Sequence, residues 1–203
     1  NKELNVVLAT VISTWGSSPR PISSQMIINK NSKFSGSVSG GCVESNVIEE
    51  SKKLIYEKKL YKSIEFAVSN DKAWEIGLAC GGEITIYLEK ISKLKKGLLE
   101  EVIKKEKEKK SFAVVTNLKN AESCIFEKGK SLDSKFKKHL KKINLYFDNK
   151  KIGIIKNTNV FIKNYNKPTK IIVVGAVHVA EHLINFAQNL NFEIILIDPR
   201  NAF

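Results

Sequence analysis

The chain has 203 residues, of which 42% are hydrophobic and 27% charged, a composition that excludes a disordered or low-complexity protein. Its net charge of +13 comes almost entirely from lysine, since only two of the 34 basic residues are arginine. The lysines lie in runs typical of solvated helix faces, so we expect no nucleic-acid partner. No apolar run approaches the roughly 18 residues needed to cross a bilayer, and no signal peptide opens the chain, which predicts no membrane span and a cytoplasmic location.

Apolar periodicity predicts an α/β protein whose first part, residues 1–90, is an α+β domain. An amphipathic helix from Cys42 to about Lys58 is expected to turn Val43, Val47, Leu54 and Ile55 inward. Strands are expected on both sides of it, and a short helix precedes the last of them. Single strands are predicted over residues 5–13, 61–68 and 83–88. A hairpin is predicted with its turn at 29–32, and the short helix is 71–77.

The middle part, residues 91–166, is rich in lysine and carries no recognisable chemical motif. Its pattern predicts helices over 93–109 and 133–142 and strands over 112–116 and 160–162. Two hairpins are expected, one about Lys128-Gly129 and one about Asp148-Asn149 within residues 145–155. Residues 164–169 read as a linker.

Residues 167–203 show a strand, a helix and a strand in that order: 171–175, 178 to about 189, and 192–198. This order predicts a parallel βαβ unit, which needs a sheet covered on both faces. Because two strands do not form such a sheet, we expect this segment to be the truncated start of a Rossmann-like domain.

Two glycine-rich loops, each holding a cysteine, are the most unusual feature. The first, residues 36–41, presents serine hydroxyls and backbone amides before a predicted helix, whose N-terminal end is partially positive and suits a phosphate or another anionic group. Cys42 falls at the helix start, where the dipole lowers the pKa of a thiol, and Glu44 falls in the first turn. Alternatively, Cys42 is a small buried hydrophobe and the glycines only form turns. The candidate anion contacts are Gly36, Ser37, Ser39, Gly40 and Gly41.

In the second loop, residues 77–82, Cys80 has no bulky neighbour, and Gly81 and Gly82 allow a ligand or another backbone to come close. If the two loops are neighbours, Cys42 and Cys80 can bracket one ligand, accept sulfur or touch a soft metal. The two cysteines lack a C-x-x-C partner and a nearby histidine, so no structural zinc site is predicted. Cys124, in the middle part, is expected to be a core residue.

The segment Trp15-Gly-Ser-Ser-Pro-Arg-Pro21 follows the first predicted strand. Arg20 stands in a chain that otherwise uses lysine, which indicates that its planar guanidinium is needed for a phosphate, a carboxylate or an aromatic face. An exposed turn arginine is the alternative. Trp15 and Trp74 are expected to pack in the core or at its rim rather than to stack on a ligand.

The segments that begin at Ala9, Phe34 and Trp74, which contain these three motifs, resemble the XdhC/CoxI family of maturation factors for molybdenum enzymes such as xanthine dehydrogenase and aerobic CO dehydrogenase. The resemblance covers about residues 6–89 and resumes at 171–203 as the family's C-terminal Rossmann-like domain. It implies a chaperone rather than a turnover enzyme. Such a protein binds the molybdenum cofactor, a molybdopterin, and protects it during terminal sulfuration by a cysteine desulfurase-type donor. It then delivers the cofactor to an apo molybdenum hydroxylase.

On this resemblance, Cys42, Cys80 and Glu44 are the candidate catalytic or sulfur-handling residues. Arg20 and the two glycine loops are the candidate cofactor contacts, and a homodimer is expected.

The start of the βαβ unit leaves its ligand open. Gly175 to Ala180 aligns with G-x-G-x-x-G/A, but Val177 replaces the second glycine, so ordinary NAD binding is in doubt. Asp198 ends the second strand where an acidic ribose contact belongs, and Arg200 follows it. A nucleotide, or a dinucleotide form of the pterin cofactor, would contact Gly175, His178, Asp198 and Arg200, and an NAD(P)-dependent oxidoreductase is the alternative function.

His178 to His182 also matches the H-x-x-E-H zinc motif. Zinc hydrolysis is not expected, because no downstream carboxylate ligand follows.

Overall fold

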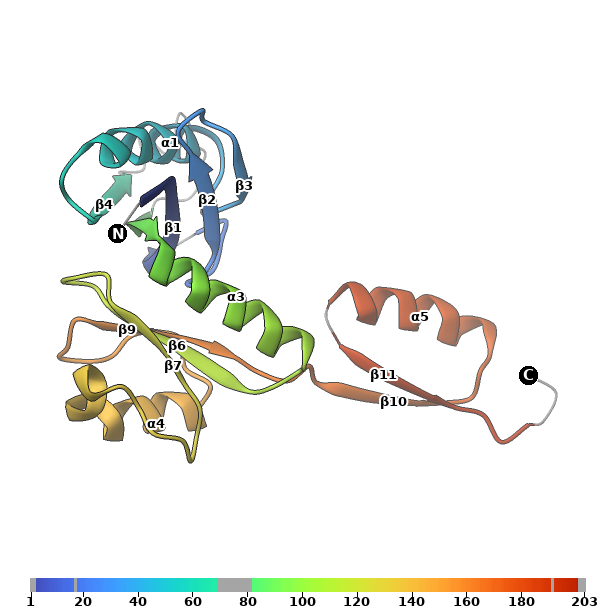
Figure 1. Ribbon diagram of the computed structural model, residues 1–203. Coiled ribbons are helices and arrows are strands. Elements are labelled where there is room, and N and C mark those ends of the chain that lie inside the picture. The colour runs from blue at the N-terminus through green and yellow to red at the C-terminus, as the bar shows by residue number, and fades with distance from the viewer. Residues whose placement is uncertain (1–2, 17, 69–81, 191, 201–203) are drawn as a thin grey trace.

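The computed structural model describes residues 3–16, 18–68, 82–190 and 192–200 (Figure 1). Two antiparallel sheets pack face to face, and a smaller parallel unit projects from them at the C-terminal side. This mixture of helices and sheets confirms the predicted α/β class. No helix of the described chain is long and apolar enough to cross a membrane.

The N-terminal sheet has the strand order β3-β2-β1-β5-β4, with every neighbouring pair antiparallel. Its centre is formed by the two longest strands, β1 and β5, which extend beyond the predicted segments because they pair with each other along most of their length. The predicted hairpin and the strand over residues 61–68 are confirmed. The strands are β1 (Glu3–Gly16), β2 (Gln25–Asn29), β3 (Phe34–Gly36), β4 (Tyr61–Val68) and β5 (Gly82–Ser92).

Helix α1 (Gly41–Tyr56) packs on one face of this sheet. The side chains of Val43, Val47 and Leu54 are fully buried and Ile55 is nearly so, which confirms the predicted inward face. They meet alternate residues of β1, because successive strand side chains point to opposite faces of a sheet. This core is built on Val7, Ala9, Val11, Met26, Ile28, Ile84, Ile86 and Leu88.

The opposite face of the N-terminal sheet packs against the middle sheet, whose strand order is β7-β6-β9-β8. Ile12 and Tyr87 from the first sheet contact Phe161 from the second. Helix α3 (Lys93–Lys107), which Ser92 caps by accepting a hydrogen bond from the Lys95 amide, connects the two sheets. The middle strands are β6 (Phe112–Asn117), β7 (Ser123–Phe126), β8 (Gly153–Ile154) and β9 (Val160–Tyr165).

The prediction of a hairpin about Lys128-Gly129 is wrong. Strand β6 instead turns directly into β7 across residues 118–122. Asparagine side chains stabilise this turn: Asn117 Oδ1 accepts from the Lys119 amide and Asn120 Oδ1 from the Glu122 amide. The middle part therefore contains a strand that sequence patterning missed.

The helix expected over residues 133–142 is also displaced. The segment is a 3-10 turn, η1 (Ser134–His139), followed by α4 (Leu140–Asp148), so residues 145–148 are helical rather than part of a hairpin. Ile143 is fully buried and Phe147, one helical turn later, packs edge-to-face on Phe126, which holds α4 on the outer face of the middle sheet. Strand β9 takes up Asn164 and Tyr165 from the expected linker.

The C-terminal unit is the predicted βαβ arrangement. Strands β10 (Lys170–Val174) and β11 (Glu193–Ile197) are parallel, and α5 (His178–Asn189) connects them. Large apolar side chains remain exposed on it, among them Ile172 at 61% and Phe186 at 66%.

Candidate functional site

The described residues of the three sequence motifs lie along the second half of β1 and on the strands at its two edges. Because the strands are antiparallel, β1 ends where β5 begins: Gly16 pairs with Gly82, and Val68 at the end of β4 pairs with Gly82 from the other side. On the other edge of β1, the end of β3 reaches the start of β2, where Gly36 pairs with Met26. We call this region the motif end, defined by Gly16, Ser18 to Gln25, Gly36 to Gly41, Val68 and Gly82.

Glu44 organises the glycine–serine loop. Its Oε1 accepts a hydrogen bond of 2.6 Å from the Ser37 hydroxyl and longer ones of 3.3 and 3.5 Å from the Val38 and Ser39 amides. These are donors that the sequence assigned to an anionic ligand. In the structure they hold the carboxylate of Glu44 instead, so this residue fixes the loop onto the first turn of α1.

The glycines of this loop differ in what they do. Gly36 has a φ of +88°, and a Cβ added there would lie 2.3 Å from the carbonyl oxygen of Gln25, so only glycine fits. Gly40 has extended backbone with φ −174°, and a Cβ added there would meet nothing within 4 Å. Gly36 therefore serves the close approach of β3 to β2, and Gly40 borders open space.

Among the described residues, no side chain caps the start of α1. Gly40 is the N-cap and offers no side chain to the first amides, which begin at Gly41 and Cys42. Ser39 is 7% exposed, and its hydroxyl has no hydrogen-bond partner among the described residues. A helix N-terminus with free amides favours a negatively charged group.

Arg20 and Trp15 lie at the surface of the same end. The Ser18 hydroxyl donates a hydrogen bond of 2.8 Å to the Arg20 carbonyl, and this bond shapes the turn. The side chain of Arg20 is exposed and forms no ion pair with the described residues. Trp15 is 72% exposed, so the prediction that it packs in the core or at its rim is wrong. Both side chains are available to a ligand or a partner.

A cleft that sequence patterning missed lies beside this motif end. It has a volume of about 380 Å³ and separates β1 from the β8 hairpin, a size within the range of small-molecule sites. Its walls come from residues more than 120 positions apart, so only the packing of the two sheets reveals it. The lining residues are Ile12, Ser13, Ile22, Tyr146, Lys151, Ile152, Gly153 and Ile154.

The cysteines are placed unequally. Cys42 is the second residue of α1, as predicted, whereas Cys80, Gly81 and Trp74 lie outside the described residues. Cys124 packs half-buried against the core of the middle sheet, in agreement with the sequence. Burial, reinforced by the charge of Asp133, raises the pKa of the Cys124 thiol to about 12, which leaves it protonated and unreactive at neutral pH.

At the C-terminal unit, the expected ribose contact is already engaged. The carboxylate of Asp198 accepts hydrogen bonds from the Arg200 guanidinium at 2.7 and 2.9 Å and from the Ala176 amide. These bonds, those of Arg200 first, hold the pKa of Asp198 well below its usual range. Gly175 has a φ of +105°, as a tight glycine turn requires. The carboxylate thus ties the end of β11 to this turn, and a nucleotide hydroxyl would have to compete with Arg200.

His178 lies beside Glu181 and His182 on the first turns of α5. Its Nδ1 lies 3.7 Å from a carboxylate oxygen of Glu181, and its ring meets that of His182 edge-to-face at 4.8 Å. Within the described ranges, no group of three or more His, Cys, Asp or Glu side chains is placed to hold a metal ion.

Residues 1–61 match the model of the XdhC and CoxI family, which confirms the resemblance seen in the sequence.

Individual relatives extend the comparison. The chain is 24% identical over 208 residues to a protein of Bacillus subtilis described as a probable subunit of xanthine dehydrogenase, covering 97% of this chain and 60% of that protein. It is 33% identical over 86 residues to the molybdenum cofactor insertion chaperone PaoD of Escherichia coli, covering 42% and 26%. A crystal structure described as a xanthine dehydrogenase from Bacillus halodurans shares the fold, with a TM-score of 0.68 at 22% identity, over 96% of this chain and 58% of that one. The chain thus spans about three fifths of the longer relatives.

Proposed function

We propose that this protein binds a molybdopterin-type cofactor at the motif end and delivers it to an apo molybdenum hydroxylase. The observation that carries the proposal is that the Arg20 segment, the glycine–serine loop and the start of β5 all lie along the second half of β1 or at its edges. The family match and the chaperone PaoD among the relatives support the same role.

The residues present fit the anionic part of such a cofactor. The open amides at the start of α1 and the exposed guanidinium of Arg20 supply positive potential, and the buried Ser39 hydroxyl supplies a polar group without a partner in the described chain. Glu44 does not contact the ligand in this scheme. It holds the loop in position, so that the amides of α1 stay open.

The cofactor supplies the molybdenum and its sulfur ligands, and the protein supplies binding and exclusion of water. We assign Cys42, at the start of α1, to the contact with the bound cofactor, since a helix N-terminus stabilises a thiolate. Cys80 and Gly81 are proposed as its counterparts from the second loop. Protection during terminal sulfuration, a cysteine desulfurase-type donor, a homodimer and a cytoplasmic location complete the proposal.

A binding titration tests the placement of the site. Isolated molybdenum cofactor is added anaerobically, and pterin fluorescence reports the dissociation constant. Arg20→Gln should weaken binding about tenfold, whereas Lys33→Gln, which removes the same charge from the exposed β2–β3 turn, should leave it unchanged. Equal weakening in both variants would indicate nonspecific attraction and would contradict the site.

Delivery is tested separately, by mixing the loaded protein with an apo molybdenum hydroxylase. Transfer of pterin to the hydroxylase, followed on a size-exclusion column, should precede the recovery of its activity. Loaded protein that retains its pterin in the presence of the apoenzyme would contradict the delivery role.

A further inference from the structure

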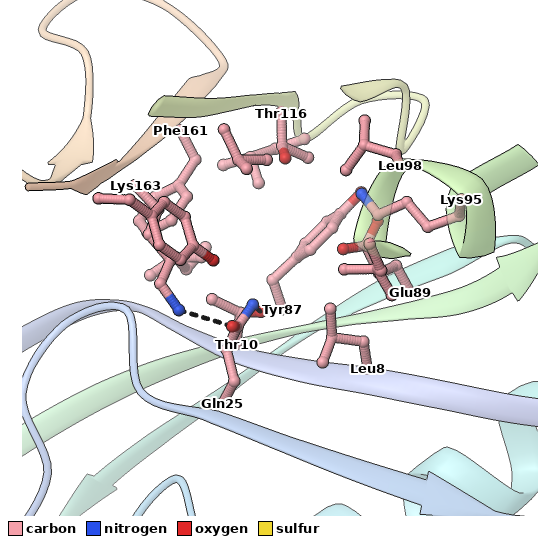
Figure 2. Close-up of a pocket in the computed structure, with 15 residues that line it drawn as sticks. Leu8, Thr10, Gln25, Tyr87, Glu89, Lys95, Leu98, Thr116, Phe161 and Lys163 are labelled. Carbon is pink, nitrogen blue, oxygen red and sulfur yellow. Dashed lines mark hydrogen bonds and ion pairs between the residues drawn. The ribbon is translucent and has the colours of Figure 1, made fainter. Parts of the chain in front are cut away.

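A second, smaller cavity lies between the two sheets, and Gln25 of the motif end is among the residues that line it. Its volume is about 30 Å³, and one helix, α3, closes its side. This is room for roughly one or two water-sized occupants. Figure 2 shows that polar side chains from both sheets and from α3 surround it: Thr10, Gln25, Tyr87, Glu89, Lys95, Thr116 and Lys163.

Hydrogen bonds fix the polarity of one wall. The ammonium group of Lys163 can only donate hydrogen bonds, and its Nζ donates one of 2.6 Å to Gln25 Oε1. This fixes the orientation of the Gln25 amide, whose Nε2 donates a hydrogen bond of 3.1 Å to Thr10 Oγ1. Because Thr10 accepts this bond, its own hydroxyl proton remains available as a donor.

The charge on this wall is not balanced. Lys163 forms no ion pair with any residue of the described ranges, although the negative charge of Glu106 acts on it from α3. Its side chain lies over the ring of Tyr165, with the nitrogen 5.0 Å from the ring centre. Burial lowers the pKa of Lys163, and the charge of Glu106 opposes this shift without reversing it.

The other wall adds a donor but no net charge. Glu89 and Lys95 are 4% and 8% exposed and pair with each other at 2.9 Å, so their charges cancel. The Tyr87 hydroxyl is buried without a hydrogen-bond partner in the described chain. The Ala121 amide, which donates to the Asn117 carbonyl, lies near it. A buried hydroxyl left unpaired costs about 1–3 kcal/mol, so a bound group is expected beside it.

We propose that this cavity binds a small monovalent anion of halide or formate size, held by the Lys163 ammonium and the hydroxyl groups of Thr10 and Tyr87. The side chains that carry these three donors line the space, Lys163 has no ion pair within the described residues, and Glu89, the carboxylate among the described lining residues, is paired with Lys95. A cation would meet the positive charge of Lys163, and a water molecule would leave that charge uncompensated. The proposal does not depend on cofactor binding at the motif end.

Bromide is the probe, because it can be located by anomalous scattering. Thermal unfolding is followed in sodium bromide and in sodium gluconate, an anion too large for the cavity, at equal ionic strength. Bromide should raise the unfolding temperature saturably. Tyr87→Phe should raise the apparent dissociation constant about tenfold, and Lys163→Met should abolish the effect. Lys138→Met, which removes one exposed positive charge from the same part of the chain, should keep it.

Crystals of the unaltered protein grown with bromide provide an independent readout. An anomalous peak within hydrogen-bonding distance of Lys163 Nζ is the expected result. No peak, or equal bromide stabilisation in wild type and Lys163→Met, would overturn the proposal and leave the cavity to water.

Discussion

The carboxylate of Glu44 accepts the hydroxyl proton of Ser37 at 2.6 Å, and this bond closes the glycine–serine loop onto helix α1. The same carboxylate draws in the Val38 and Ser39 amides. One acidic residue thus organises the loop that the sequence assigns to an anionic ligand, and the amides at the start of α1 remain for the ligand itself.

Replacing Glu44 with alanine should therefore loosen the loop. Hydrogen bonds to a charged group contribute about 1.5–3 kcal/mol, so urea unfolding should show a loss of that size. Glu49→Ala is the matched control, because Glu49 lies on the same helix but forms only an exposed ion pair with Lys53; we expect a change below about 0.5 kcal/mol. Similar losses in the two variants would refute the role of Glu44.

Two glycines of the same loop should respond differently to alanine. Gly36→Ala places a Cβ against the Gln25 carbonyl at a positive φ, and should lower the free energy of unfolding by more than about 2 kcal/mol. Gly40→Ala enters open space with extended backbone, and should cost no more than about 1 kcal/mol. Denaturant titration of the pair measures the difference, and tolerance of Gly36→Ala would show that β3 does not approach β2 as described.

The Glu89–Lys95 pair should be strongly coupled because it is buried between the sheets. Lys95→Met leaves a buried carboxylate without its partner and should destabilise the protein by about 3–5 kcal/mol, whereas the double variant with Glu89→Gln should recover much of this loss. Lys96→Met, which removes an exposed partner of Glu100, should cost less than about 1 kcal/mol.

The pH dependence of Lys95→Met gives a second check. Burial raises the pKa of Glu89 and Lys95 opposes that rise, so without Lys95 the folded protein favours the protonated acid. The destabilisation should shrink as the pH falls toward the ordinary value of 4.5, where the unfolded chain also takes up the proton. A destabilisation that is constant from pH 8 to pH 5 would argue that Glu89 is not the group left unpaired.

The thiol of Cys124 should not react with alkylating reagents in the folded protein. In a variant with Cys42→Ser and Cys80→Ser, the remaining thiol should react with iodoacetamide at pH 8 only after unfolding, since its pKa is raised to about 12. Between pH 9, where the unfolded thiol ionises, and pH 12, the folded protein should lose stability, because only the unfolded state gives up the proton. Rapid reaction of the folded variant would place Cys124 at the surface and contradict its packing against the middle sheet.

Local periodicity accounts for the parts of the fold that the sequence predicted well. Helix α1 and its inward residues Val43 and Val47 follow from apolar spacing, and the βαβ unit follows from two apolar strands flanking one helix. The hairpin turn at residues 118–122 was missed because its stability comes from asparagine side chains rather than from glycine. Strand β1 continues to Gly16, past the turn residues that suggested an earlier end, because β5 pairs with it.

The contacts that define the two sites lie beyond local patterning. Gln25 and Lys163 are 138 residues apart in the sequence, and their bond exists only because the two sheets pack face to face. The motif residues themselves were visible in the sequence, but not that Glu44 would use the donors of Ser37 and Ser39. A carboxylate in the first turn of a helix is favourable in any case, so its position alone did not indicate a partner.

Whether this protein carries molybdenum cofactor can be measured on the protein as cells make it. The protein is purified anaerobically from cells that make the cofactor, and molybdenum and pterin are quantified per chain. We predict near-stoichiometric pterin in the wild type and in Cys124→Ala, and its loss in Cys42→Ala. Wild-type protein that emerges empty from cofactor-rich cells would contradict the account.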